Sequence, residues 1–255
     1  MHIDNTLFVG KVLHHFDRLP STNDYALDLL SQGEIVEGTV ISTDDQYRGR
    51  GQMGNTWESN SGQNVALSII LKPHFLTPTQ QFQLNIAVSL AVRATIAAYL
   101  SQKVDIKWSN DILVDGKKVS GTLIQNQLNG RQLQSSIIGI GINVNQRQFS
   151  PNLPHASSLA LLGNELIELQ DIRHRLCQQI EQYYIRLRNG HIGNLKQAYL
   201  SHLWQYQKWA LYRLPHLLQP IHGKIIGVKD SGELVMEHQD HQATYGFKEI
   251  SFVMS

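Results

Sequence analysis

The feature that most constrains this chain is the alternation of strand-like runs with helical segments along its first two thirds. Apolar runs of strand length are bounded by turn residues, and a segment with Leu84, Ala87 and Ala91 on one helical face lies between two of them. Such alternation is typical of a mixed α/β domain. The 255 residues allow one large domain, or a catalytic domain with a smaller one attached.

The predicted strands are short. They cover residues 11–16, 36–42, 64–71, 104–108, 112–114, 120–127 and 135–144. Ser21 is an N-cap candidate for a helix that Gly33 ends, and Thr77-Pro78 opens what the pattern predicts to be the longest helix. The pattern turns helical again past Pro151, most clearly over residues 169–187.

The end of the chain returns to short β-like runs, GKIIGVK, ELVMEH and ATYGFKEISFV. Asp230-Ser231-Gly232 and the polar residues 238–242 separate them. This pattern predicts a small barrel-like module attached to the main domain. We therefore expect a catalytic domain over residues 1–205 and a β-barrel domain over residues 206–255.

Composition and charge favour a cytoplasmic protein. The net charge is +1, from 22 Lys+Arg against 21 Asp+Glu, so nothing global draws the chain to nucleic acid or to an anionic membrane. Fewer than about 20 residues precede Ser21, too few for a helix-turn-helix domain. No apolar run reaches membrane length, and the single cysteine, Cys177, suits a reducing compartment. We expect neither DNA nor a membrane as a partner.

Three segments carry residue types suited to chemistry. The first is the polar loop TDDQYRGRGQMGNTWES. Gly49, Gly51 and Gly54 would let its backbone approach an anion, and Arg48 and Arg50 can pair with a phosphate or a carboxylate. Glycine and arginine spacing alone leaves two interpretations open, a phosphate-binding loop and a flexible surface loop.

The second segment is KWSNDILVDGKKVSGTLIQ, in which Lys107, Asn110, Asp111 and Lys118 flank a predicted hairpin. A lysine can neutralise charge that develops on a phosphate oxygen, and an Asp beside an Asn can help to hold Mg²⁺ with nucleotide phosphates. The alternative is a solvated charge cluster on a polar hairpin. The third segment, IIGIGINVN, contains Asn143, which offers a donor and an acceptor to a ribose or base, or simply ends a buried strand.

Taken in order, STN, GRG…W, KW-x-ND…K-x-x-G and GIGINVN resemble the biotin protein ligase family. The resemblance covers Ser21 to about Leu162, and the terminal β module is similar to the family's SH3-like end domain. It implies a mixed-sheet catalytic domain like that of class II aminoacyl-tRNA synthetases, in a monofunctional enzyme without the DNA-binding domain of the repressor type. The implied enzyme is a biotin–[acetyl-CoA-carboxylase] ligase, a monomer or homodimer. It uses ATP with Mg²⁺ to form biotinyl-5′-AMP, and transfers biotin to a lysine of a biotin carboxyl carrier protein.

The resemblance also implies roles for individual residues. Those implied for biotin are Ser21, Thr22 and Asn23, with Gln46 at the other side of the pocket, the loop residues Gly49, Arg50 and Gly51 over the carboxylate, and Lys118 and Gly121. Those implied for the nucleotide are Arg48, Gln52, Asn55, Trp57, Lys107, Asn110, Asp111, Lys118 and Asn143. Lys118, Arg50 and Asp111 are the expected catalytic residues, and Asp111 is the expected metal ligand.

The sequence departs from the family pattern in two places. Ser109 stands where the family usually has proline, and Gln52 and Asn55 stand where it often has cations. Arg48 adds one cation before the loop, but we expect a weaker hold on the adenylate and easier leakage of it. Other interpretations are a lipoate or octanoate ligase, whose signature fits poorly, a biotin-sensing repressor, and a non-catalytic binding protein.

Overall fold

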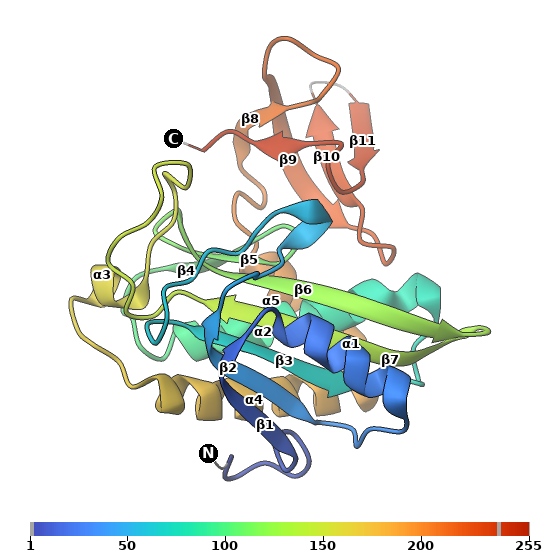
Figure 1. Ribbon diagram of the computed structural model, residues 1–255. Coiled ribbons are helices and arrows are strands. Elements are labelled where there is room, and N and C mark those ends of the chain that lie inside the picture. Colours follow the sequence, from blue (N-terminus) through green and yellow to red (C-terminus); the bar gives the residue numbers. More distant parts are fainter. Residues whose placement is uncertain (1–2, 239–240, 255) are drawn as a thin grey trace.

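A seven-stranded sheet forms the centre of the molecule (Figure 1). The computed structural model describes residues 3–238 and 241–254, without the side chain of Met53. The strands, in their order across the sheet, are β1 (Leu13–Leu19), β2 (Val40–Gln46), β3 (Val65–Leu71), β7 (Gln132–Ile142), β6 (Lys117–Asn129), β5 (Asp111–Val114) and β4 (Val104–Lys107). The pair β1–β2 is parallel and the other pairs are antiparallel, so the predicted mixed α/β architecture is confirmed.

Each strand predicted for the main domain is present, with ends shifted by up to four residues, most in β1, β2, β6 and β7. The central strand β3, VALSIIL, is buried along its whole length, which explains why it reads as a continuous apolar run. β2 begins at Val40 instead of residue 36, because Thr39 N donates to Val36 O at 3.2 Å and Gly38, with φ 84°, turns the chain there.

Helices cover both faces of the sheet (Figure 1). On one face lies α1 (Thr22–Gln32), which begins after Ser21, whose side chain accepts the Asp24 N–H, and ends at Gly33 as predicted. On the other face lie α2 (Gln81–Ile96), α4 (Leu169–Arg188) and α5 (Ile192–Ser201). Three short helices complete the set: η1 (Gln52–Gly54), η2 (Pro78–Gln80) and α3 (Leu159–Gly163).

The prediction that the segment after Thr77 is the longest helix was wrong. Thr77-Pro78 opens the separate 3₁₀ turn η2, so that α2 has 16 residues, whereas α4 has 20. α2 is apolar nearly all round because it is packed between the sheet and α4. Within the described residues, no helix is both long and apolar enough to cross a membrane.

The C-terminal segment forms a second, five-stranded antiparallel sheet that stands above one end of the first (Figure 1). Its strands, in spatial order, are β11 (His241–Tyr245), β10 (Leu234–His238), β9 (Ile221–Val228), β8 (Trp209–Arg213) and β12 (Ser251–Phe252). We call residues 209–252 the C-terminal module. Of the predicted polar linker 238–242, Gln239 and Asp240 lie outside the described residues. The division at residue 205 stays a prediction.

Candidate active site

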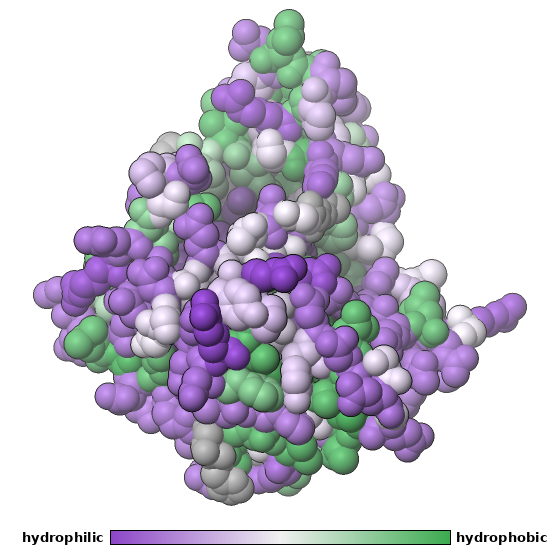
Figure 2. All heavy atoms as spheres, viewed as in Figure 1, coloured by the Kyte–Doolittle hydropathy of each residue, from purple (hydrophilic) through white to green (hydrophobic). Residues whose placement is uncertain are grey.

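A pocket of about 420 Å³ opens between the large sheet and the C-terminal module, where Figure 2 shows the surface hollowed. It gathers the start of α1, the loop after β2, strands β5 to β7 and the last residues of the C-terminal module. Its lining includes most of the residues predicted from sequence: Ser21, Thr22, Asn23, Gln46, Arg50, Gly51, Gln52, Asn55, Trp57, Lys107, Asn110, Asp111, Lys118 and Gly121. The strand order brings together positions that lie up to about a hundred residues apart in sequence.

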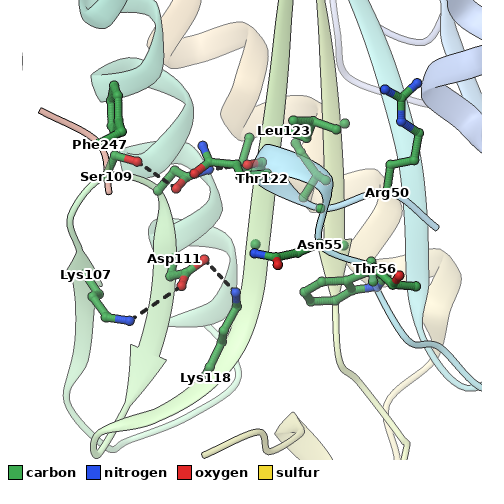
Figure 3. Close-up of a pocket in the computed structure, with 18 of the residues that line it drawn as sticks. Arg50, Asn55, Thr56, Lys107, Ser109, Asp111, Lys118, Thr122, Leu123 and Phe247 are labelled. Carbon is green, nitrogen blue, oxygen red and sulfur yellow. Dashed lines mark hydrogen bonds and ion pairs between the residues drawn. The ribbon is translucent and has the colours of Figure 1, made fainter. Parts of the chain in front are cut away.

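One end of this pocket is charged. Lys118 Nζ lies 2.8 Å from Asp111 Oδ1, and Lys107 Nζ lies 3.9 Å from Asp111 Oδ2 (Figure 3). Lys107 and Asp111 face each other across the β4–β5 hairpin, and Lys118 comes from the neighbouring strand β6. All three side chains are partly buried, so water screens the interactions between their charges less than it would on the open surface.

The two lysines outnumber the carboxylate between them. Burial lowers the pKa of Lys107, Asp111 acts to raise that pKa, and the neighbouring Lys118 lowers it again. The cluster of Lys107, Asp111 and Lys118 therefore favours an added anion, which would relieve the repulsion between the two ammonium groups.

The segment that carries Lys107 and Asp111 is braced by buried hydrogen bonds. Asn110 Nδ2 donates to the carbonyl of Thr122, and Asn110 Oδ1 accepts from Ser109 Oγ at 2.9 Å. The Ser109 carbonyl accepts from Asn85 Nδ2 at 3.0 Å and from the Tyr199 hydroxyl at 2.9 Å, and the peptide bond preceding Ser109 is cis. Asn110 lines the pocket, but its amide is engaged with the protein.

The other end of the pocket is neutral and bonded to itself. The backbone N and Oγ1 of Thr22 donate to Gln46 Oε1 at 2.9 and 3.2 Å. The Ser68 hydroxyl lies 2.7 Å from Thr22 Oγ1 and 2.6 Å from Asn23 Oδ1, and shares its hydrogen between them. Asn23 Nδ2 donates to Gln125 Oε1 at 2.9 Å. We call these five residues the polar chain.

The polar chain corrects one expectation and adds two residues. Gln46 lies beside Thr22, not across the pocket, because β2 ends under the first turn of α1. Sequence reasoning missed Ser68 and Gln125. Ser68 left a signal, since it is the single polar residue of the wholly buried strand β3.

Glycines of β7 make room for side chains that cross the sheet. A Cβ at Gly139 would lie 2.1 Å from Asn23 Oδ1, and one at Gly141 would lie 2.4 Å from the Trp57 ring. The Trp57 indole thus lies flat against the sheet inside the pocket, and its Nε1 is buried without a hydrogen-bond partner among the described residues. The glycines of GIGIN therefore admit the side chains of Asn23 and Trp57 to the surface of the sheet.

The glycine loop is closed on itself by short contacts. Gly51 N donates to Asn55 O at 2.7 Å around the 3₁₀ turn η1. The guanidinium of Arg50 pairs with Asp24 in the first turn of α1, and in Figure 3 it points away from Lys118 and Asp111. Arg50 lines the pocket from the side of α1, and an anion would have to draw it from Asp24.

Three predicted site residues do not line the pocket. Arg48 is exposed, and its backbone N donates to Pro20 O at 3.0 Å. Gly49 is buried under Trp57, and its carbonyl oxygen accepts a hydrogen bond from the Trp57 backbone N at 3.0 Å. Asn143 is buried below the pocket and donates to Ser157 O at 3.0 Å.

Asn143 nevertheless supports the charged end. The carbonyl of Ser157 accepts the hydrogen bond from the Asn143 amide, and the backbone N of Ser157 donates to Lys118 O at 2.9 Å. The backbone of Lys118 in turn donates to His155 O at 2.7 Å. Asn143 therefore braces the segment that flanks Lys118, a role that a terminal strand asparagine does not reveal in sequence.

The chain shares long stretches of sequence with known proteins. Residues 15–143 match the biotin/lipoate A/B protein ligase family. The bifunctional ligase/repressor BirA of Bacillus spizizenii is 32% identical over 249 residues, which cover 92% of this chain and 72% of that protein. The chain belongs to the biotin/lipoate A/B protein ligase family. Within this family, the biotin–[acetyl-CoA-carboxylase] ligase of Mycobacterium tuberculosis is 26% identical over 193 residues, covering 73% of this chain and 70% of that protein.

Solved structures of family members share the fold. The biotin protein ligase of Aquifex aeolicus, in complex with biotin and ATP, superposes with a TM-score of 0.79 at 23% identity and covers 96% of this chain and 100% of that one. The enzyme of Leishmania major with biotinyl-5-AMP gives 0.62 at 20% identity, with 92% and 99% covered. The predicted fold class and the predicted membership among the biotin protein ligases are confirmed.

Five further lining residues come from the C-terminal module: Phe247, Lys248, Ile250, Ser251 and Phe252. No sequence signal indicated them, since FKEISF reads as an ordinary strand and turn. They make the second sheet one wall of the pocket.

Proposed function

We propose that this chain uses ATP to convert biotin to biotinyl-5′-AMP and transfers the biotin to a lysine of a biotin carboxyl carrier protein. One observation carries this proposal. A single pocket joins a neutral, hydrogen-bonded end to a charged end with two lysines, beneath a glycine loop. The neutral end suits the ring of biotin, and the charged end suits the phosphates of ATP.

The polar chain suits the ureido ring of biotin, which carries two N–H donors and one carbonyl acceptor. Gln46 Oε1 already accepts twice from Thr22, while Gln46 Nε2 has no acceptor among the described residues and remains for a ligand carbonyl. Thr22 Oγ1 retains a lone pair for a ligand N–H. A lipoyl or octanoyl group would leave these groups unpaired, at about 1–3 kcal/mol each, so biotin is the better substrate within the family.

The charged end suits attack on the α-phosphate. A carboxylate oxygen of biotin would bond to the α-phosphorus of ATP, while the bond from that phosphorus to the bridging oxygen breaks and pyrophosphate leaves. We propose that Lys118 exchanges Asp111 for the α-phosphate and offsets the negative charge that grows on its oxygens. The glycine loop would close over the mixed anhydride and exclude water.

Mg²⁺ fits beside Asp111 only with help from the nucleotide. Among the described residues, no group of three His, Cys, Asp or Glu side chains could hold a metal alone. Asp111 Oδ2, 3.9 Å from Lys107, lies beyond hydrogen-bond distance and keeps its lone pairs. One carboxylate with phosphate oxygens and water is a usual Mg²⁺ environment, and the bound ion would neutralise phosphate charge.

In the second half-reaction the amine of the carrier lysine would attack the acyl carbon, and AMP would leave with the electrons of the broken anhydride bond. Asp111, at the centre of the charged end, is placed to orient that amine or accept its proton.

Biotin-dependent exchange of labelled pyrophosphate into ATP tests the first half-reaction, with lipoate and octanoate as matched alternatives. We expect exchange with biotin and little with the other two. Absence of exchange with biotin would overturn the proposal. Incubation with a carrier domain, and with its Lys→Arg variant as control, tests the transfer. Labelling of both carriers alike would contradict a lysine-specific acceptor.

A further inference from the structure

An aromatic ring of the C-terminal module faces a cation of the charged end. Lys107 Nζ lies 5.5 Å from the centroid of the Phe252 ring. Phe252 belongs to β12, and both residues line the pocket. Lys107 is therefore held on one side by Asp111 and on the other by a residue almost 150 positions later in the chain.

Phe252 is itself fixed in place by two neighbouring rings. Its ring centroid lies 5.5 Å from that of Trp204 and 5.3 Å from that of Tyr212. Tyr212 belongs to β8 and is the partner of Phe252 in the pairing of β12 with β8. The backbone N of Trp204 donates to Ile106 O at 2.8 Å, one residue before Lys107. A closed path thus runs from β4 through Trp204 and Phe252 back to the Lys107 side chain, and it fixes the ring relative to the strand that bears the lysine.

The residue after Lys107 is also seated on the C-terminal module. The Trp108 ring stacks on Phe247, with centroids 4.9 Å apart and planes 7° from parallel. Trp108 Nε1 donates to Gly232 O at 2.9 Å. The side chains of two consecutive residues of the KW-x-ND segment therefore contact the C-terminal module, whereas the polar chain lies wholly within the first sheet and α1.

We propose that Phe252 is a positioning residue for nucleotide binding, whose ring holds the Lys107 ammonium inside the pocket where the phosphates of the nucleotide meet it. This rests on the function proposed above. A long, flexible lysine loses its fixed position when one of its two flanking contacts is removed. The C-terminal module is then part of the nucleotide half of the site and not of the biotin half.

Titration calorimetry of ATP and of biotin against Phe252→Leu and Phe252→Tyr tests this directly. Phe252→Leu keeps an apolar side chain but removes the ring. We expect its Kd for ATP to rise about fivefold, the typical effect of losing an aromatic partner of a cation. The Kd for biotin should stay within about twofold. Phe252→Tyr keeps the ring and should restore ATP binding.

Trp209 offers a matched control. Lys224 Nζ lies 5.2 Å from the centroid of the Trp209 ring, which is a contact of the same kind, and Trp209 belongs to the same sheet as Phe252. Trp209 is, however, 51% exposed and does not line the pocket. Trp209→Leu should leave both Kd values unchanged. If Trp209→Leu weakens ATP binding as much as Phe252→Leu does, the effect belongs to the module in general and the inference is overturned.

A double-mutant cycle shows whether Phe252 acts through Lys107. Lys107→Met should weaken ATP binding, and adding Phe252→Leu should then change nothing further. An equal loss in both backgrounds, or an equal loss of biotin binding, overturns the inference. If Phe252→Leu lowers the midpoint of thermal unfolding by more than about 3 °C, Phe252→Met replaces it in the same cycle.

The outcomes separate this inference from the proposed function. A wild type that binds ATP but shows no biotin-dependent exchange overturns the proposed function, while the ATP Kd of Phe252→Leu still decides the role of the ring. Equal ATP Kd values for wild type and Phe252→Leu overturn the inference alone. A wild type that binds no ATP overturns both.

Discussion

The two ends of the pocket hold their side chains in different ways. At the neutral end, Thr22, Asn23 and Ser68 are at most 4% exposed and are bonded to one another. At the charged end, the side chains of Lys118 and Asp111 are 37% and 24% exposed and are held by an ion pair. The neutral end is a buried network of hydrogen bonds between neutral groups, whereas the charged end pairs groups that a ligand can separate.

The difference follows from the free energies of the groups. Buried neutral polar groups are costly to leave unpaired, so the polar chain resists rearrangement and can be selective about shape. A partly exposed ion pair is worth little by itself, so Lys118 can leave Asp111 for a phosphate at small cost. We therefore propose that specificity and chemistry are divided between the two ends.

The largest expected effect is at the charged end. Lys118→Ala should slow biotin-dependent pyrophosphate exchange by about 100-fold or more, since losing one charge-stabilising group costs about 3 kcal/mol of barrier. The neighbouring Lys117 is exposed and does not line the pocket, so Lys117→Ala is the matched control and should exchange normally. A Lys118→Ala rate within about threefold of wild type would remove Lys118 from the reaction.

The next effect probes the rigidity of the neutral end. Gly139→Ala places a Cβ within 2.1 Å of Asn23 Oδ1, so Asn23 has to move and the polar chain breaks. Overpacking of this kind costs about 2 kcal/mol, and the Kd for biotin should rise roughly thirtyfold. Gly193, in the first turn of α5, has open space where a Cβ would lie, so Gly193→Ala is the control and should bind biotin normally. Unchanged biotin binding by Gly139→Ala would show that this end adapts.

A smaller effect tests the link between the two residues of α1. Ser68→Ala removes the hydroxyl that lies against both Thr22 and Asn23, which leaves buried acceptors unpaired at about 1–2 kcal/mol. The KM for biotin should rise about tenfold in the exchange assay, with the KM for ATP unchanged. A parallel rise of both KM values would mean that the two ends are not independent.

Effects of similar or smaller size concern retention of the adenylate by the loop. Arg50→Ala should speed release of preformed biotinyl-5′-AMP about tenfold, and Gln52→Arg should slow it a few-fold, because a charged donor replaces a neutral one. Arg48→Ala should have little effect, since Arg48 is exposed and outside the pocket lining. Release rates by filter binding decide this. Equal acceleration by Arg48→Ala and Arg50→Ala would place both arginines on the ligand.

Much of the molecule follows from local sequence. Ser21 and Gly33 set the ends of α1, and the apolar run of β3 specifies a strand buried on both faces. The turn at Asp115-Gly116 indicated the hairpin that Lys107, Asp111 and Lys118 flank. The order and spacing of the motifs were enough to indicate the family, because they are properties of the sequence itself.

Other features were decided only by the tertiary structure. Arg50 pairs with Asp24, Asn143 donates to Ser157, and the Phe252 ring lies against Lys107, each through a contact between separate segments of the chain. Local patterns fix periodicity and turns, but they do not fix which strands become neighbours or in what register. The side chains that complete the pocket therefore depend on the packing of the two sheets, which no single segment of the sequence encodes.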